Sequence, residues 1–450
     1  MANPLTSFFL DPVVVDRDQA PRNFQLSGDV RWWAFPLGLG IAALAIALVG
    51  IGTDATRFWY AYLVGWVFCV SIAIGCLFFV MIQHITKARW SVTIRRVPEL
   101  MIANFPALAL LGLPILLFGM HDLFHWTHAD LYEVGGDHYD PILAGKQGYL
   151  NMPFFVVRFA LYFGLFSFLG RKLYRYSVLQ DTKKSAELTK KQRFWSGAGI
   201  PLSAIATAFF GYDYLMSLDP HWFSTMFGVY FFAGGWLACL SLIALLVMVF
   251  RRAGVAELEM TKEHIQDVGK FMFAFVVFWA YIAFSQYMLI WYGNLPEETQ
   301  WFADRFTNGW DTFSWTLLLG HFAFPFFALL PRFSKRVLPI LGFMAIWLLF
   351  MHWVDLIWLS MPTIAAEAAH TAAAHAAEAG HAVVTGAGGQ VASLEEVSSS
   401  THASLTLTDF AAWIGMFGTF LGLTLWRAGR HAITAYGDPF FTDSIRFENV

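Results

Sequence analysis

The chain has 450 residues, of which 57% are apolar, 18% aromatic and only 14% charged, and its mean hydropathy is +0.54. Soluble globular proteins carry about 25% charged residues, so this composition excludes a water-soluble fold and predicts an integral membrane protein. The formal charge of -3 says little as a sum, because the distribution of charge along a membrane chain decides its orientation.

Ten apolar runs follow a polar N-terminal segment, residues 1–31, which lacks the charged-then-apolar pattern of a cleavable signal peptide. Each run is long enough to cross a hydrocarbon core of about 30 Å, which takes about 20 residues. The runs cover residues 32–52, 58–83, 98–118, 150–169, 194–217, 222–250, 268–292, 311–330, 337–360 and 409–426. We therefore predict an all-α integral membrane protein of about ten transmembrane helices, with the first span kept as an anchor.

Lys and Arg are distributed unevenly over the connections between these runs. The two terminal segments and every second connection together contain 24 of them, whereas the connections on the other side contain only Arg57, Lys146 and Arg305. Because positive charge marks cytoplasmic loops, we expect both termini in the cytoplasm.

Two sets of four spans share local patterns. The pattern W-x5-G-x2-F begins at Trp59 in the second span and at Trp222 in the sixth, and Arg158-Phe-Ala in the fourth span recurs as His321-Phe-Ala in the eighth. These matches predict two parallel four-helix bundles between two flanking helices, with chance similarity of aromatic-rich helices as the alternative. The predicted divisions are the first flanking helix 32–57, bundles 58–220 and 221–360, a periplasmic loop 361–408, a last helix 409–427 and a cytoplasmic tail 428–450.

Histidines in the outer loops raise the question of a metal site. Four of them lie in the low-complexity stretch 361–408: His370, His375, His381 and His402. Their spacing does not place three on one helical face, so we favour a solvated spacer and expect no metal. The outer loop 119–149 is richer in His and Asp and offers a surface for a partner.

Covalently bound redox centres are also not expected. The cysteines Cys69, Cys76 and Cys239 all lie in apolar runs, which excludes an iron–sulfur ligand set, and the CxxCH motif of c-type haem attachment is absent.

Ionisable side chains within the spans are the best functional candidates. Placing each one in the membrane costs a few kcal/mol of free energy, so it is kept only if it is paired or has a function. Arg158 lies about seven residues inside the fourth span, hence roughly 10 Å deep, and either Asp213 or Asp122 is placed to neutralise it. The second predicted bundle carries His321, His352 and Asp355 at related positions.

These groups admit two interpretations. One is a proton-conducting or quinone-facing cluster in the outer half of each bundle, and the other is a structural ion pair that fixes helix register. In the seventh span Tyr281 and Ser285 share a helical face that is suited either to hydrogen-bonded water or to helix–helix contacts. Lys270 and Glu99 lie at cytoplasmic helix entrances, where we expect both to reach the surface.

Two longer segments resemble a known family. They are residues 278–298, FWAYIAFSQYMLIWYGNLPEE, and residues 211–222, GYDYLMSLDPHW. With the ten-span plan, they resemble the NrfD-like and polysulfide-reductase-like membrane subunits, in particular the smaller such subunit of bacterial alternative complex III. The likeness covers nearly the whole chain.

The resemblance implies a part in quinol:cytochrome c oxidoreduction in the respiratory chain of a bacterial inner membrane. The implied partners are a larger homologous membrane subunit, an iron–sulfur subunit, and multihaem and monohaem cytochrome c subunits that carry the haem c and iron–sulfur clusters. Lipid and quinol are the other expected contacts, and nucleic acid is not.

The resemblance also implies quinone or menaquinone as ligand, held near the outer face by His and Asp side chains. The positional candidates are His121, Asp122, Arg158 and Asp213. Because the larger subunit of that complex is credited with the quinol site, a proton route is the alternative role. Its candidate residues are Arg158, Asp213, Tyr281, Ser285, His321, His352 and Asp355.

Two other classes of function remain open at the level of sequence. A stand-alone secondary transporter would also use parallel repeats and intramembrane charges, although no broken Gly/Pro pair lies at matching midplane positions. A purely structural membrane subunit is the third class.

Overall fold

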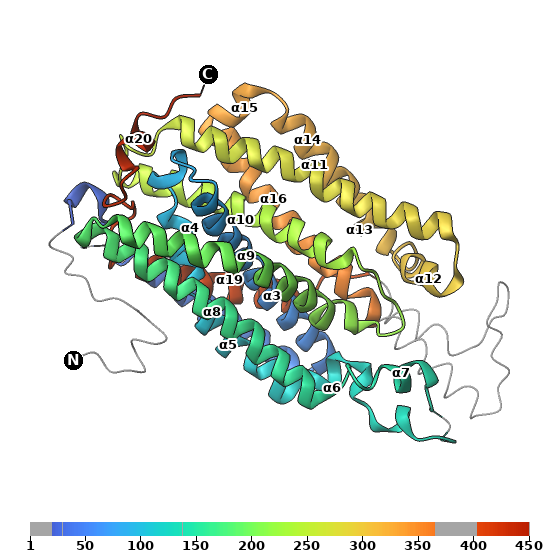
Figure 1. Cartoon of the computed structure of the whole chain (residues 1–450). Helices are drawn as coiled ribbons and strands as arrows, with labels where there is room; N and C mark the ends of the chain where they lie inside the picture. Colours follow the sequence, from blue (N-terminus) through green and yellow to red (C-terminus); the bar gives the residue numbers. More distant parts are fainter. Residues whose placement is uncertain (1–19, 29, 137, 365–402, 450) are drawn as a thin grey trace.

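A computed structural model describes residues 20–28, 30–136, 138–364 and 403–449. Within these residues the chain forms helices and no strand, and ten helical segments are long and apolar enough to cross a membrane. The long helices run side by side as one bundle (Figure 1). The prediction of an all-α, multi-pass membrane protein is therefore confirmed.

Most of the ten spans are single continuous helices. These are α2 (Ala34–Val49), α3 (Ala55–Ile85), α8 (Met152–Lys183), α9 (Ala186–Tyr214), α10 (Phe227–Arg252), α11 (Lys262–Gly293), α16 (Leu338–Ser360) and α19 (Leu407–Ala428). Shorter helices lie in the connections, namely α7 (Pro141–Lys146), α12 (Pro296–Asp304) and α15 (Arg332–Arg336), and α20 (Phe441–Ile445) lies in the C-terminal segment after the last span.

The third and eighth spans are interrupted. The third comprises α4 (Arg96–Ile102), α5 (Phe105–Pro114), a π-helical segment η5 (Ile115–Gly119) and α6 (Met120–Leu123). The eighth comprises α13 (Trp310–Thr316), a π-helical segment η9 (Leu317–Ala323) and α14 (Phe324–Leu329). Pro325 has no N–H to donate to the carbonyl of residue 321, which accounts for the irregular backbone around His321.

Helix α3 forms the centre of the bundle, and its most apolar stretch is entirely buried. It packs against α10 because small residues allow the two backbones to approach closely. A Cβ atom at Gly75 would lie 2.7 Å from Cys239 Cβ, and one at Gly235 would lie 2.8 Å from the Ser71 carbonyl oxygen. The flanking helices α2 and α19 pair with each other in the same way, and α19 also packs on α3.

Equivalent helix pairs pack in the two predicted four-helix groups. The second span contacts the third and fifth, as the sixth contacts the seventh and ninth, and the fourth packs on the fifth as the eighth packs on the ninth. The parallel-repeat interpretation and the division boundaries stay predictions.

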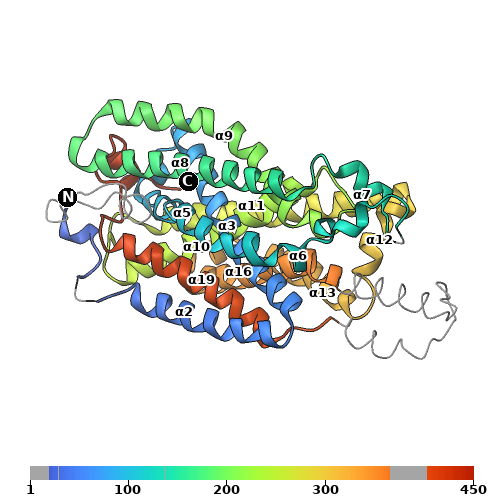
Figure 2. The same cartoon turned by 90° about the horizontal axis from the view of Figure 1, so that it is seen from below.

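Segments near both chain termini meet at one end of the bundle, which we call the terminal end. There Ala256 donates its N–H to the Asn23 carbonyl at 2.8 Å, and Ile433 donates to the Phe24 carbonyl at 2.8 Å. Helices α7 and α12 lie at the opposite end, which we call the loop end (Figures 1 and 2). Both described terminal segments thus lie on one side of the spans, as an even number of crossings requires.

Candidate functional site

The first four-helix group buries an ion pair between α8 and α9. Arg158 Nε lies 2.7 Å from Asp213 Oδ2, and Arg158 Nη2 lies 3.1 Å from Asp213 Oδ1. Two tyrosines complete the shell, since Tyr149 donates its hydroxyl to Oδ1 at 2.9 Å and Tyr162 donates to Oδ2 at 2.7 Å. The Asp213 carboxylate therefore accepts four hydrogen bonds while only 1% of the residue is exposed.

Aromatic and backbone contacts hold the Arg158 side chain of this pair in place. The Arg158 guanidinium lies 3.9 Å from the centre of the Tyr149 ring and donates to the Tyr149 carbonyl at 2.9 Å. Burial, reinforced by the neighbouring Asp213 charge, raises the pKa of Tyr149, so its hydroxyl stays protonated and remains a donor. Of the two partners considered for Arg158, the structure selects Asp213.

The other two quinone-binding candidates lie apart from this pair. Among the described residues, neither His121 nor Asp122 hydrogen-bonds to Arg158 or Asp213. His121 is exposed at the loop end and stacks on the ring of His128 at 4.0 Å, and Asp122 is partly exposed. His121 and Asp122 therefore lie apart from the Arg158–Asp213 pair, and the four residues do not form a single ligand-binding site.

The second four-helix group buries a different arrangement around Asp355 of α16. The Tyr230 hydroxyl of α10 donates a short hydrogen bond to Asp355 Oδ1, and the Trp279 ring N–H of α11 donates to Oδ2 at 3.2 Å. Asp355 is 1% exposed, and no Lys or Arg of the described chain lies within ion-pair distance of it. Its charge is therefore not balanced as that of Asp213 is.

Two buried histidines lie close to Asp355. His321 of η9 stacks on the Trp279 ring at 4.1 Å with an interplanar angle of 8°, and both its ring nitrogens lack a partner with hydrogen-bonding geometry among the described residues. His352 lies one helical turn before Asp355, and its Nε2 is 2.9 Å from Ser71 Oγ of α3. The structure thus brings His321, His352 and Asp355 together, with Trp279 between the first and the last.

A fully buried cation of the same four-helix group, Arg305, has a structural role instead. Arg305 donates to the carbonyls of Trp358 at 3.1 Å and Leu359 at 2.8 Å, so it caps the C-terminal end of α16. Its guanidinium also lies 3.3 Å from the centre of the Trp301 ring. It stabilises the helix that carries Asp355 without forming an ion pair with that acid.

The proposed polar face of the seventh span lies outside these clusters. Tyr281 is 63% exposed on the outer surface of α11, and Ser285 is partly exposed. Gln286 is buried instead, and its Oε1 has no partner among the described residues. Of these three polar residues of α11, only Gln286 is buried in the bundle.

Sequence reasoning missed the partners that complete the two clusters and a polar face on α9. The missed partners are Tyr149, Tyr162, Tyr230, Trp279 and Ser71. The α9 face carries Gln192, Ser203 and Thr207, all buried with side-chain polar atoms unpartnered in the described chain. Gln192, Ser203 and Thr207 recur at the helical period, so the sequence alone could have predicted this polar face.

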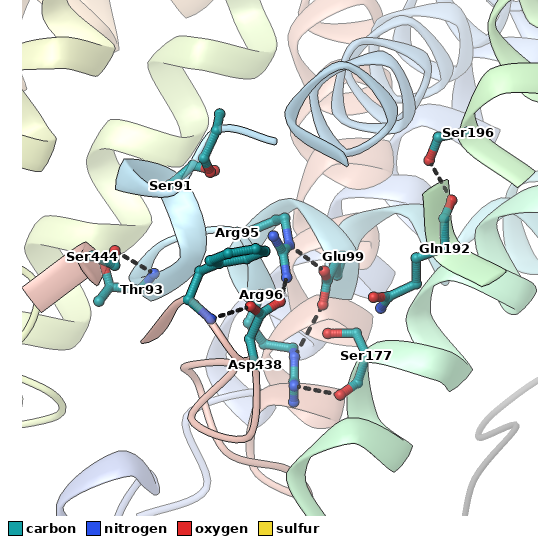
Figure 3. Close-up of polar contacts among 12 residues, drawn as sticks. Ser91, Thr93, Arg95, Arg96, Glu99, Ser177, Gln192, Ser196, Asp438 and Ser444 are labelled. Atoms are coloured by element: carbon teal, nitrogen blue, oxygen red, sulfur yellow. Dashed lines mark hydrogen bonds and ion pairs between the residues drawn. The ribbon is translucent and has the colours of Figure 1, made fainter. Parts of the chain in front are cut away.

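A second buried charge network lies at the terminal end (Figure 3). Glu99 accepts from Arg95 at 3.2 Å and from Arg96 at 3.0 Å. Arg95 also reaches Asp438 at 2.6 Å, and Arg96 reaches Asp181 at 2.9 Å. The expectation that Glu99 reaches the surface is wrong, because it is fully buried between two arginines; Lys270 is exposed as expected.

This network joins distant parts of the chain. Asp438 belongs to the C-terminal segment, and the Gly437 N–H donates to Asp181 Oδ1 at 3.2 Å. The C-terminal segment is therefore held against α4 and α8 by buried charges, which is a structural role.

No group of three or more metal-ligand side chains is found among the described residues, and the four histidines of 361–408 lie outside them. Comparison with protein-family models finds none that matches the chain, and comparison with curated proteins finds no match. The assignment of function therefore rests on the residues and their geometry.

Proposed function

We propose that this chain is the proton-handling membrane subunit of a respiratory quinol:cytochrome c oxidoreductase in a bacterial inner membrane, with both termini in the cytoplasm. The observation that carries this proposal is Asp355, a fully buried acid with two hydrogen-bond donors and no cationic partner in the described chain. An isolated carboxylate in such a place is costly, whereas a carboxyl group that takes up and releases a proton is useful.

The neighbours of Asp355 suit proton exchange. Tyr230 and His352 are groups that can both donate and accept, and Ser71 connects His352 to the central helix. A proton leaving Asp355 would meet acceptors within the bundle before it meets lipid. In the proposed complex, the haem and iron–sulfur subunits carry out the redox chemistry. This chain takes up and releases protons in response to the changes of charge in those subunits.

The resemblance of residues 211–222 and 278–298 supports the choice of complex, because these segments contain Asp213 and Trp279. Both residues lie inside the clusters described above. The Asp213 ion pair is the better candidate for a structural role, and quinone binding by His121, Asp122, Arg158 and Asp213 remains a separate proposal.

Purification of the tagged chain from its native membrane in mild detergent tests the proposal. We expect c-type haem in the reduced-minus-oxidised spectrum and quinol-dependent cytochrome c reduction. Asp355→Asn should preserve haem content and lower proton movement in proteoliposomes by at least about tenfold, since a positioned proton-transfer group contributes about 100-fold or more. Asp267→Asn, at a partly exposed surface pair with Lys270, is the matched control and should change neither.

A colourless and inactive single polypeptide would contradict the respiratory proposal and favour a transporter. An assembled, active complex whose Asp355→Asn variant moves protons normally would keep the complex but reject the role of Asp355.

A further inference from the structure

An apolar groove runs along the outside of the bundle between the third span and α8. Its walls include Ala109 and Leu113 of α5 and Ala160 and Gly164 of α8, and its volume is about 690 Å³. Small residues hollow out this face, and a Cβ atom built at Gly164 meets nothing within 4 Å. The helix surface is therefore concave here over several turns.

Three cations close the groove toward the terminal end. They are Arg171, Lys172 and Arg175, which lie in the C-terminal half of α8. Arg171 and Arg175 are one helical turn apart, so they lie on the same face of α8. The Lys172 ammonium lies 5.5 Å from the centre of the Phe168 ring, which is itself part of the groove wall.

The dimensions of the groove match one leaflet of a bilayer. From Ala160 to Lys172, a separation of 12 residues, α8 rises about 18 Å, which is close to half of a hydrocarbon core of about 30 Å. The apolar walls therefore lie at the depth of acyl chains, and the three cations lie at the depth of head groups. They lie at the basic end of the bundle, where the charge distribution predicts the cytoplasmic leaflet.

We propose that this groove is a binding site for an anionic phospholipid. One acyl chain would lie along Ala109, Ala160 and Gly164, and the phosphate and acidic head group would contact Arg171, Lys172 and Arg175. Charge complementarity selects this occupant over a neutral lipid, since basic pockets between transmembrane helices on the cytoplasmic side favour acidic head groups. The proposal is independent of the respiratory assignment.

Native mass spectrometry of the delipidated full chain, titrated with phosphatidylglycerol or phosphatidylcholine, tests it. We expect wild type to bind phosphatidylglycerol at least about tenfold more tightly, and the variant R171Q/K172Q/R175Q to bind the two lipids equally, because each cation near the surface contributes to the attraction. The control K183Q/K190Q/K191Q removes three exposed cations at the same end but outside the groove, and should keep the preference.

Two further variants test the apolar part. Gly164→Leu should fill the groove and weaken binding of phosphatidylglycerol at least tenfold, whereas Gly197→Leu on α9, where a Cβ also meets nothing within 4 Å, should not. Ala160→Leu is the second groove variant if Gly164→Leu is not monodisperse. Equal binding of the two lipids by wild type, or unchanged preference in the triple variant, overturns the proposal. It is also overturned if Gly164→Leu keeps its lipid but loses a copurifying membrane protein, which would make the groove a helix-docking site.

Discussion

Each of the two four-helix groups buries one aspartate near the loop end, and the two are neutralised differently. Asp213 accepts two hydrogen bonds from Arg158 and two from tyrosines, so a cation lies directly against its carboxylate. Among the described residues, Asp355 accepts hydrogen bonds only from Tyr230 and Trp279, and Arg305 donates to backbone carbonyls instead. Both acids are buried to the same extent, so burial alone does not separate them; the absence of a counter-charge in the described chain distinguishes Asp355.

The largest effect is expected at the matched pair. Asp213→Ala leaves Arg158 buried without its anion, so the free energy of unfolding should fall by about 3–5 kcal/mol. Unfolding by sodium dodecyl sulfate in mixed micelles measures the change. Asp267→Ala, which breaks a partly exposed pair with Lys270, should cost about 0.5 kcal/mol. Equal costs for the two variants would show that the Arg158–Asp213 pair is not held as described.

The terminal-end network should respond less strongly. Glu99→Gln removes the carboxylate shared by Arg95 and Arg96 but leaves Asp438 and Asp181 in place, so we expect a loss of about 2–3 kcal/mol. Glu263→Gln, at the more exposed pair with Arg336, is the control and should cost under about 1 kcal/mol. The same unfolding assay applies, and a negligible effect of Glu99→Gln would contradict its burial between two arginines.

Asp355→Asn should cost only about 1 kcal/mol. The amide keeps one acceptor for Tyr230 and loses the bond from Trp279, and no buried cation is left without a partner. A cost as large as that of Asp213→Ala would mean that Asp355 is a charged structural group after all, and the difference between the two groups would disappear.

The substitution Gln192→Leu tests whether the polar face of α9 lowers the stability of the chain. Both side-chain polar atoms of Gln192 are unpartnered among the described residues, so replacing them with an apolar side chain should raise the free energy of unfolding by about 1 kcal/mol. Ser196→Ala, which removes a bond to the Gln192 carbonyl at 2.8 Å, should not stabilise the chain. A destabilised Gln192→Leu variant would indicate that this amide binds ordered water.

The smallest effect concerns the loop end and its dependence on pH. Partial burial alone would raise the pKa of Asp140, but the Leu143 N–H and the His221 ring outweigh it and lower that pKa. The stabilisation by Asp140 is therefore complete above its ordinary pKa of about 3.9 and is lost as the pH falls through the lowered folded value. Hydrogen exchange of α7 should accelerate only below about pH 4, and Asp140→Asn should remove this dependence.

Much of the fold followed from the sequence because membrane burial demands long apolar helices. The ten spans and the joint location of the terminal segments were predicted from hydropathy and from the placement of Lys and Arg. The interruption at His321 was not, because Pro325 signals a weak point in the helix but not the form that the backbone takes there.

The site was predictable only in part. Arg158, Asp213, His321, His352 and Asp355 stood out because charged and polar side chains are rare in such spans. Tyr230 and Trp279 did not, because aromatic residues are common throughout the chain and only the fold shows which ones reach an acid. Glu99 was misplaced for a related reason, since nothing local showed that the C-terminal segment would cover it.

The central claim, that Asp355 is a proton-exchanging acid, is tested most directly by infrared spectroscopy of the purified chain at neutral pH. The account predicts a C=O stretching band of a protonated carboxyl group that shifts in D₂O and is lost in Asp355→Asn. A band that is absent from wild type, or that persists unchanged in Asp355→Asn, would contradict it.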